Sequence, residues 1–430
     1  MFIIYDLIFL IFALIYLPVY LFKRKFHKGF LARLGILPRG LKLDRPIWIH
    51  AVSVGEVMAI RSLLEELRRA YPGKNFVIST VTATGNKIAK SIAQETDFVT
   101  YLPLDLSFLV RIVINKINPS LFILAETEIW PNLISCLHKR KIPIVTVNGR
   151  ISDGSFKGYS VIKFLLKPIL TKISLFCVQT QLDAERFAAL GVAREKIKVS
   201  GNLKFDTTDY TDKKFTKDTD YKQKLGLEKR EKLFVAASTH PGEEKIILSV
   251  YKELSSEFPY LRLLIAPRHP ERAKEIERVI KKYEFNSLRV SGLMGERVNG
   301  LTGEWANRQT VFILDTIGEL MSYYTIADIV FVGGSLVQKG GHNILEPASL
   351  EKPILFGPHV FNFRGITDLF LTDDAAIMVN SPEALKQKIK ELLIDPGQAK
   401  EIGRKAGETL FKNKGSTKRA IELIKNELFR

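Results

Sequence analysis

The stretch Leu121-Phe122-Ile123-Leu124-Ala125 is wholly apolar and only five residues long, and the acidic pair in Glu126-Thr127-Glu128 follows it at once. A run this short and this uniformly apolar is typical of a strand that is buried on both faces. Such strands occur in parallel sheets that are covered by helices on each side. The stretch therefore predicts an α/β fold built on a parallel sheet.

Apolar runs and amphipathic stretches alternate outward from this strand in both directions. We predict further strands at 47–52, 75–80, 142–147 and 175–179, and helices at 57–70 and 84–95. A second series of strands is predicted at 233–237, 261–266, 311–314, 329–332 and 353–356. This alternation is the signature of doubly wound α/β domains.

The chain has 430 residues, which is too long for one ordinary hydrophobic core. The strand pattern breaks at a polar, charged stretch that suits a linker. We expect a Rossmann-like domain at 29–206, a linker at 207–230, a second Rossmann-like domain at 231–415 and a C-terminal helix at 416–430. Two such domains create a cleft, and ligands bind at the carboxyl ends of the strands.

The composition indicates which classes of binding partner to expect. The net charge is +18, and the basic residues are spread along the chain without a recognition helix, zinc finger or aromatic nucleic-acid motif. We therefore expect a membrane surface or an anionic lipid substrate, and no nucleic acid. The two cysteines, Cys136 and Cys177, are expected to be reduced thiols rather than a disulfide, which fits a cytosolic face.

The amino terminus reads as a membrane anchor. Residues 1–22 are apolar except for Asp6, and Lys23-Arg24-Lys25-Phe26-His27-Lys28 follows. About 20 apolar residues can span a bilayer, and the basic flank predicts that its side is cytoplasmic. Because no cleavage site follows, 1–28 is predicted to be an uncleaved anchor rather than a secretory signal. Asp6 and Pro18 leave open a helix that lies in the interface.

Acidic residues follow two predicted strands of the first domain. Glu56 comes after Ser53-Val54-Gly55 at a helix start, where it is either a favourable partner of the helix dipole or a general base. Glu126 and Glu128 would share one face of a strand, and burial beside a like charge would raise one pKa. Alternatively, they cap the helix that begins near Pro131.

Two basic residues of the first domain are candidate site residues. Arg150 could bind an anion or pair with Asp153. Lys204 could reach into the cleft, although taken alone it reads as an ordinary surface lysine.

In the second domain, Arg268 and His269 stand between a strand and a helix and could hold a phosphate. A metal site at His240, His269 and His342 is the weaker reading, because the spacing of zinc ligands is missing.

Two glycine-containing segments follow in the second domain. Gly333-Gly334-Ser335-Leu336 and the segment from Gly340 to Pro347 should bare backbone amides and form a phosphate cradle at a helix start. Asn343 and Glu346 lie three residues apart, on one face of that helix, and Glu346 could accept hydrogen bonds from a ribose diol.

Taken together, these motifs resemble the bacterial 3-deoxy-D-manno-octulosonic acid (Kdo) transferases over nearly the whole chain. Six motifs carry the resemblance in the right order: His50-Ala51-Val52-Ser53-Val54-Gly55-Glu56, Glu126-Thr127-Glu128-Ile129-Trp130-Pro131-Asn132, Asn148-Gly149-Arg150, Gly201-Asn202-Leu203-Lys204-Phe205-Asp206, Pro267-Arg268-His269-Pro270-Glu271-Arg272 and Gly340-Gly341-His342-Asn343-Ile344-Leu345-Glu346-Pro347.

The resemblance implies a GT-B fold, an acceptor-binding first domain and a second domain that binds the CMP-sugar donor. It implies inverting transfer of Kdo from CMP-Kdo to a lipid A precursor, lipid IVA, in lipopolysaccharide biosynthesis at the bacterial inner membrane, without a metal or cofactor. Glu56 matches the family's general base, and Glu126 and Lys204 match positions that stabilise the transition state. The implied CMP-binding residues are Arg268, His269, Ile317, Gly318, Glu319, Asn343, Ile344, Leu345 and Glu346.

Two other functions are compatible with parts of the pattern. Another GT-B membrane glycosyltransferase would share the cradle but use a UDP or GDP donor and a different lipid acceptor. A membrane-tethered binding protein with a degenerate site would lack catalytic carboxylates, whereas this sequence has Glu56, Glu126 and Glu128.

Overall fold

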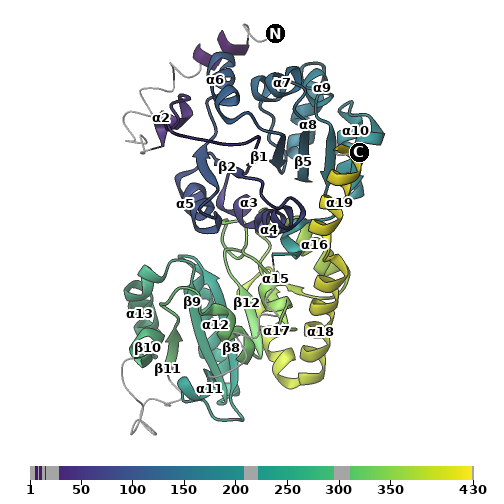
Figure 1. Cartoon of the computed structure of the whole chain (residues 1–430). Coiled ribbons are helices and arrows are strands. Elements are labelled where there is room, and N and C mark those ends of the chain that lie inside the picture. Colours follow the sequence, from purple (N-terminus) through teal and green to yellow (C-terminus); the bar gives the residue numbers. More distant parts are fainter. Residues whose placement is uncertain are drawn as a thin grey trace. The chain divides into compact units, whose positions relative to one another are not determined.

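The computed structural model describes residues 5–7, 9–11, 15, 29–207, 221–294 and 310–428. The chain divides into two compact units (Figure 1). Met1–Thr207 and Asn413–Arg430 form the first unit, and Thr208–Lys412 forms the second. The C-terminal residues thus belong to the first unit, and the second unit lies between two parts of the first in the sequence.

A seven-stranded parallel sheet organises the first unit, in the order β3-β2-β1-β4-β5-β6-β7. Its strands are β1 (Ile47–His50), β2 (Phe76–Thr80), β3 (Phe98–Tyr101), β4 (Leu121–Ala125), β5 (Ile144–Gly149), β6 (Leu175–Val178) and β7 (Ile197–Val199). The strand order reverses between β1 and β4. Ligands of open α/β sheets bind at such a switch point, beyond the carboxyl ends of the strands.

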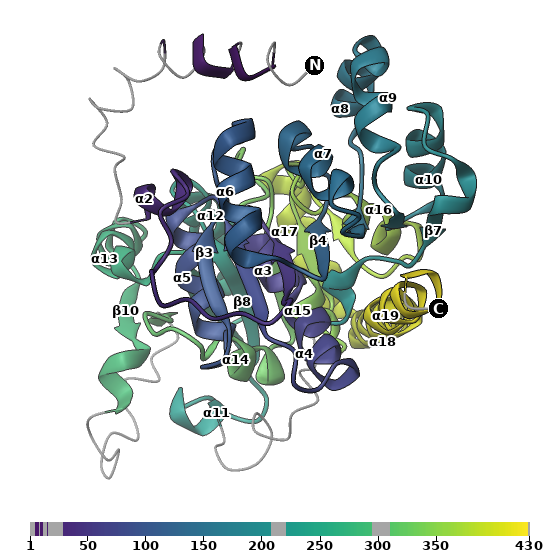
Figure 2. The same ribbon diagram turned by 45° about the horizontal axis from the view of Figure 1, so that its top comes forward.

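Helices cover both faces of this sheet, and two apolar cores fill the space between helices and strands (Figure 2). The helices are α2 (Phe30–Arg33), α3 (Val54–Ala59), α4 (Arg61–Ala70), α5 (Ala83–Ile92), α6 (Ser107–Ile117), α7 (Pro131–Lys139), α8 (Asp153–Val161), α9 (Lys163–Leu170), α10 (Gln181–Ala189) and the C-terminal α19 (Ser416–Leu428). The helix predicted at 57–70 is two helices, since the chain turns at Ile60 between α3 and α4.

The expected anchor at 1–28 lies mostly outside the described residues. Tyr5–Leu7, Phe9–Ile11 and Ile15 are helical. Within the described stretches, no helix combines the length and the apolar character that a membrane crossing needs.

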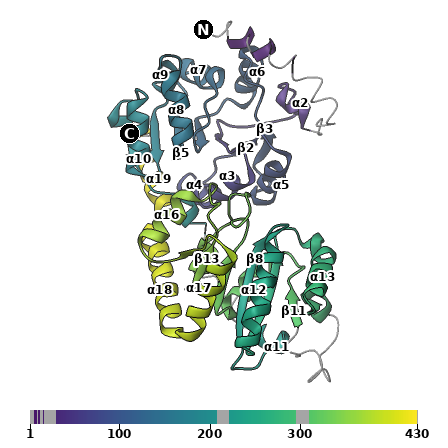
Figure 3. The same cartoon turned by 180° about the vertical axis from the view of Figure 1, so that it is seen from behind.

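The second unit repeats the architecture with a parallel sheet in the order β10-β11-β9-β8-β12-β13-β14 (Figure 3). Its strands are β8 (Lys232–Thr239), β9 (Leu261–Pro267), β10 (Asn286–Arg289), β11 (Thr310–Ile313), β12 (Ile329–Val332), β13 (Ile354–Phe356) and β14 (Ile377–Met378). Its helices are α11 (Tyr221–Lys224), α12 (Glu243–Glu257), α13 (Ala273–Lys282), α14 (Leu320–Ile326), α15 (Leu345–Ala348), α16 (Arg364–Thr372), α17 (Pro382–Ile394) and α18 (Pro396–Asn413). Here the switch point lies between β8 and β12.

Every strand that the sequence predicted is present, with shifts of a few residues at the ends. Four edge or near-edge strands, β3, β7, β10 and β14, were not predicted. Cys136 and Cys177 are both free thiols, as expected.

Candidate active site

In the first unit, the predicted acidic residues gather at the switch point of the sheet. Glu56 lies in the helix that follows β1, and Glu126 directly follows β4, the strand paired with β1. The fold therefore brings together two carboxylates that are 70 positions apart in the sequence.

The Glu56 side chain is nearly buried, with 9% of the residue exposed. Its carboxylate accepts a hydrogen bond from the Val52 amide at 2.8 Å and another from the Ser53 hydroxyl at 2.9 Å. Burial raises the pKa of Glu56, and the nearby charge of Glu126 acts in the same direction, while the two hydrogen bonds oppose the rise. The carboxylate is thus held in one orientation and is more basic than an exposed glutamate.

Glu126 and Glu128 do not lie on a strand, contrary to the prediction that they share a strand face. The strand ends at Ala125, and Glu126 has a φ of 58°, a left-handed conformation that is costly for a residue with a Cβ. They do not cap α7 either, because Asp105 accepts hydrogen bonds from the amides of Asn132 and Leu133. The predicted pKa rise is present: burial, followed by Glu56 and Glu126, raises the pKa of Glu128 to about 7.

Lys204 is not a surface lysine. Its side chain is 18% exposed, and its Nζ lies 3.9 Å from Oε1 of Glu126. Burial lowers the pKa of Lys204, the negative charge of Glu126 counteracts this, and Arg150 adds to the lowering. The other reading for Arg150, a pair with Asp153, is wrong, because Asp153 is paired with Arg186. The first unit therefore holds a compact group of three carboxylates and a lysine.

His50, at the end of β1, is a structural member of this region. It is fully buried, and its Nδ1 lies 3.0 Å from both oxygens of Ser79. Burial lowers the pKa of His50 to about 3, so the ring is neutral at physiological pH. Because the ring is enclosed and only weakly basic, His50 contributes to the structure of β1 rather than to proton transfer.

In the second unit, the glycine loop after β12 is not open to a phosphate as predicted. The amides of Gly334, Ser335 and Leu336 donate to the carboxylate of Glu243, at 2.7 to 3.0 Å. The His240 amide donates to the same carboxylate at 2.9 Å, and Glu243 is fully buried. A carboxylate of the chain therefore occupies the position that the sequence assigned to a bound anion.

Glu243 was missed as a functional position, although its motif was visible in the sequence. It is the first residue of α12, after Gly242 with a φ of 103°. An acidic residue in the first turn of a helix that follows a strand is usually read as a dipole partner. Its second role, as acceptor for loop amides 91 to 93 positions away in the sequence, depends on the tertiary fold.

Two histidines meet beside this loop. The Nε2 atoms of His240 and His342 are 2.8 Å apart, and their rings are stacked with an angle of 6°. Burial, followed by the positive charge of Arg268, lowers the pKa of His342 to about 4. Within the described ranges, no group of three or more histidine, cysteine or acidic side chains is arranged around a metal position.

Arg268 and His269 follow β9 directly, as predicted. Both are exposed, and the His269 ring lies 6.1 Å from that of His240, centroid to centroid. His269 Nδ1 is 3.5 Å from Glu271. Two basic side chains at the carboxyl end of a strand next to β8 can receive an anionic ligand.

The segment after the glycine loop ends in a helix of only four residues, α15. The Asn343 side chain is bonded to the first two residues of this helix. Its Oδ1 accepts from the Leu345 amide at 3.1 Å, and its Nδ2 donates to Glu346 at 3.2 Å. Asn343 precedes the helix, so it does not share a helix face with Glu346 as predicted, although the two side chains are hydrogen-bonded. Ile344 and Leu345, which lie between them in the sequence, are buried.

The remaining predicted residues, Ile317, Gly318 and Glu319, form a bend before α14. Gly318 has a φ of 91°, which a residue with a side chain rarely adopts. Glu319 accepts a hydrogen bond from the Thr316 hydroxyl, and Ile317 is almost fully exposed.

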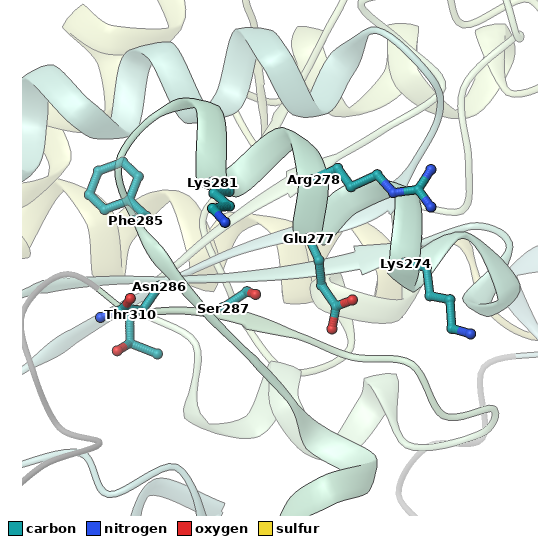
Figure 4. Close-up of a pocket in the computed structure, with 8 residues that line it drawn as sticks. All are labelled: Lys274, Glu277, Arg278, Lys281, Phe285, Asn286, Ser287 and Thr310. Atoms are coloured by element: carbon teal, nitrogen blue, oxygen red, sulfur yellow. The ribbon is translucent and has the colours of Figure 1, made fainter.

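A cavity of about 810 Å³ lies elsewhere in the second unit, between α13 and the strands β10 and β11 (Figure 4). Its wall carries Lys274, Arg278 and Lys281 on one face of α13. None of the predicted site residues lines it.

Solved structures of similar architecture define the fold class. The chain is similar to the UDP-N-acetylglucosamine 2-epimerase of Neisseria meningitidis bound to UDP-GlcNAc, with a TM-score of 0.60 and 13% identity over 89% of this chain and 100% of that one. A glycosyltransferase of Rickettsia africae matches with a TM-score of 0.55 and 16% identity over 90% and 99% of the two chains. Two α/β units with parallel sheets thus form a GT-B-like fold.

Sequence relatives identify the family. Residues 28–207 match the family model of the 3-deoxy-D-manno-octulosonic-acid transferases (kdotransferases). The chain is 39% identical to the 3-deoxy-D-manno-octulosonic acid transferase of Haemophilus influenzae over 89% of this chain and 87% of the relative. It is 31% identical to that of Chlamydophila psittaci over 97% and 94%. The chain belongs to the 3-deoxy-D-manno-octulosonic acid transferase family and is a glycosyltransferase.

Proposed function

We propose that the chain transfers Kdo, with inversion, from CMP-Kdo to a lipid A precursor such as lipid IVA in lipopolysaccharide biosynthesis. The observation that carries this proposal is the group of Glu56, Glu126 and Lys204 at the switch point of the first sheet, in a chain of this family. We further propose that the enzyme works at the cytoplasmic side of the bacterial inner membrane, where a phosphorylated lipid acceptor and a basic protein attract each other.

Glu56 is the proposed general base. An inverting transfer needs a base that deprotonates the acceptor hydroxyl on the face opposite the leaving group. The carboxylate of Glu56 is oriented by Val52 and Ser53, and its raised pKa brings it nearer to the pH of the cytoplasm, which favours proton abstraction.

Glu126 and Lys204 are proposed to stabilise the transition state. Burial depresses the pKa of Lys204, but the adjacent carboxylate of Glu126 favours its ammonium form. The ammonium group would then stand next to the negative charge that develops during transfer. A fixed, partly buried cation of this kind acts more strongly than one in water.

The second unit is proposed to hold the CMP leaving group. Arg268 and His269 would compensate the charge that gathers on the phosphate. Asn343 to Glu346 and the bend at Ile317, Gly318 and Glu319 would bind the nucleoside, with the carboxylate of Glu346 on the ribose diol. No metal or cofactor is part of this proposal. Transfer then requires that the sugar on the second unit meets the carboxylates of the first.

The reaction is tested by incubation with tetraacylated lipid A precursor and CMP-Kdo, followed by mass spectrometry of the lipid product. We expect a mass gain of one or more Kdo residues. Thermal shifts with CMP, UDP and UMP identify the donor base, and a clear preference for UDP would contradict the assignment in favour of another GT-B glycosyltransferase.

Glu56→Gln tests the base role. Loss of general base catalysis should lower the transfer rate roughly 100- to 10,000-fold, while CMP binding stays nearly unchanged because the nucleotide contacts lie in the other unit. Glu65→Gln is the matched control, since Glu65 is exposed on α4 and pairs only with Arg61 among the described ion pairs. A Glu56→Gln variant that transfers at the wild-type rate rules out the base role.

A further inference from the structure

His240 and His342 form a hydrogen-bonded pair at the carboxyl end of the second sheet. His240 directly follows β8, and His342 comes after the glycine loop that follows β12. Their Nε2 atoms are 2.8 Å apart, and the two ring planes differ by 6°. A bond between two Nε2 atoms needs one hydrogen, so one ring donates Nε2–H and the other accepts at its lone pair.

The glycine loop and Glu243 fix the position of the pair. The carboxylate of Glu243 accepts from the amides of His240 and Gly334, at 2.9 and 2.7 Å. Gly334 has a φ of 67°, and a Cβ there would lie 2.9 Å from Cδ2 of His342 and 3.4 Å from Cδ2 of His240. The loop backbone thus lies directly against both rings, and only glycine leaves them this space. The two imidazoles are therefore positioned before any ligand binds.

Four basic side chains surround the pair. Arg268 and His269 follow β9, and the His269 ring lies 6.1 Å from the nearer ring of the pair, centroid to centroid. Arg272 and Lys339 act on the same ring through their charge. Burial and these positive charges lower the pKa of both rings, that of His342 to about 4, so the pair is neutral at pH 7.5.

The carboxylates close to the pair are engaged by other groups. Glu243 is fully buried and accepts from the loop amides. Oε1 of Glu244 accepts from Arg272 at 2.7 Å and from the hydroxyl of Thr239 at 2.9 Å. Among the described ion pairs none includes Arg268 or the lysine beside the pair. A bound anion would supply the negative charge that these cations lack and would reverse their effect on the rings.

We propose that the His240–His342 pair is part of the phosphate subsite of the second unit and takes up one proton when a nucleoside monophosphate binds. This inference rests on the proposed function, because it places the phosphate of CMP beside the pair. It gives two histidines a ligand-binding role that no metal site and no base role accounts for.

The geometry of the pair limits the uptake to one proton. The ring that donates Nε2–H has its lone pair on Nδ1, and a proton from the solvent binds there. That ring becomes an imidazolium whose Nε2–H still points to its partner, so the bond between the rings becomes charge-assisted and stronger. A second proton would place two N–H groups against each other.

The uptake also favours departure of the nucleotide during transfer. The phosphate of the donor is a diester with a single negative charge, whereas the released monoester is a dianion at neutral pH, since its second pKa is about 6. A positive charge on the pair therefore stabilises the leaving group more than it stabilises the bound donor.

Calorimetry of CMP binding in two buffers counts the protons. The full chain is titrated at pH 7.5 in HEPES and in Tris, whose ionisation enthalpies differ, and we expect an uptake of roughly 0.5 to 1 proton per CMP. Cytidine, which lacks the phosphate, should cause none. CMP that binds without uptake overturns the proposal, and an equal uptake with cytidine contradicts the phosphate as its cause.

The affinity for CMP gives a second measure that needs no variant. Because the complex holds more protons than its separate components, the Kd should rise roughly 2- to 6-fold between pH 7.5 and pH 8.5. An equal Kd at the two pH values contradicts proton uptake.

Variants locate the proton. His240→Gln combined with His342→Gln should leave less than about 0.2 proton taken up per CMP. His138→Gln, at an exposed histidine on α7, is the matched control and should keep the wild-type uptake, as should His269→Gln. Uptake that is lost in His269→Gln and kept in the double variant assigns the proton to His269 and sinks the proposal. If the double variant does not bind CMP, the pH dependence of the wild-type Kd decides.

The choice of nucleotide separates this inference from the proposed function. Proton uptake with UMP and no binding of CMP would refute the CMP donor and leave the role of the pair standing. Transfer of Kdo without proton uptake on CMP binding would refute the role of the pair and leave the proposed function standing. A chain that binds neither nucleotide contradicts both.

Discussion

The carboxylates of Glu56, Glu126 and Glu128 share one small region with Lys204, so the protonation of Glu56, Glu128 and Lys204 depends on the charges of their neighbours. Three acids and one base would carry a net charge of −2 if all were ionised. Burial makes this costly, and Glu128, with a pKa of about 7, holds a proton over much of the physiological range.

Lys204→Met removes the one cation of this group. We expect the transfer rate to fall roughly 100- to 1,000-fold, as for other fixed groups that stabilise a transition state. Because the lysine favours the ionised form of Glu56, its loss should raise the pKa of Glu56 and move the acidic limb of the kcat/KM profile to higher pH. An acidic limb that stays in place would show that the lysine does not act on the carboxylates.

Glu128→Gln should change stability in a pH-dependent way. The pKa of Glu128 is raised from 4.5 to about 7 in the folded state, so its contribution is present below pH 4.5 and is lost as the pH rises through 7. Between pH 4.5 and pH 8 the free energy of unfolding of the variant should therefore improve, relative to that of the wild type, by on the order of 1–2 kcal/mol. This figure includes an allowance for solvent screening.

Thermal unfolding at the two pH values measures this gain, which corresponds to roughly 2–8 °C in Tm for a unit of this size. The same substitution at the exposed Glu65 serves as the control. A stability difference between the Glu128→Gln variant and the wild type that is the same at pH 4.5 and at pH 8 would contradict the raised pKa.

For single residues, the sequence predicts the identity of the candidate site residues better than it predicts the contacts between them. Glu56, Glu126 and Lys204 stand in motifs at strand ends, and that position is visible in the sequence. The left-handed backbone at Glu126 and the ion pair with Lys204, 78 positions away, result from the packing of the sheet and have no local signal.

The glycine loop and α12 form the element that deviates most from its prediction. The loop amides point to Glu243, at the amino end of α12, so helix and loop are joined through one carboxylate. The partial positive charge of the helix start favours the ionised carboxylate, and burial opposes it, which raises its pKa. The loop is thereby fixed in shape before any ligand binds.

Glu243→Ala should destabilise the second unit by roughly 3–5 kcal/mol, because buried amides are left without an acceptor. CMP affinity should fall as the loop loses its shape, while the first unit keeps its stability. Glu253→Ala is the matched control, because Glu253 lies later on α12 and its exposed side chain pairs with Lys386 of α17. Thermal unfolding and calorimetric CMP titration measure both effects, and an unaltered melting transition would exclude the bracing role.

Central strands could be predicted from the sequence, and edge strands could not. The runs Leu121–Ala125 and Ile329–Val332 are apolar at every position because helices cover both faces of the sheet. By contrast, Asn286–Arg289 and Ile197–Val199 are short and partly exposed, and their side chains give neither a continuous apolar run nor a clear alternation.

Over the whole molecule, the second unit is an insertion within the first. Helix α19, at the end of the chain, packs on α4 and β6, and its Ala420, Ile421 and Ile424 belong to the core beneath the first sheet. The first unit is thus completed by residues that follow the second unit in the sequence.

Ile424→Ala tests this dependence. Removal of a fully buried side chain should cost the first unit roughly 2–5 kcal/mol. Hydrogen exchange should speed up in β1 and β4 and remain unchanged in β8 and β9. Glu422→Ala, on the exposed side of α19, is the control, and equal exchange in both variants would contradict the assignment of α19 to the first core.

Asp206 has a consequence for how the gene could have been assembled. It stands where the chain leaves the first unit, and its carboxylate accepts from the amides of Gly415 and Thr417, where the chain comes back, at 2.7 and 2.5 Å. The exit and the return are therefore neighbours. A loop of about two to six residues would bridge them, so the coding segment between them can be excised or exchanged for another module while the first unit retains an uninterrupted core.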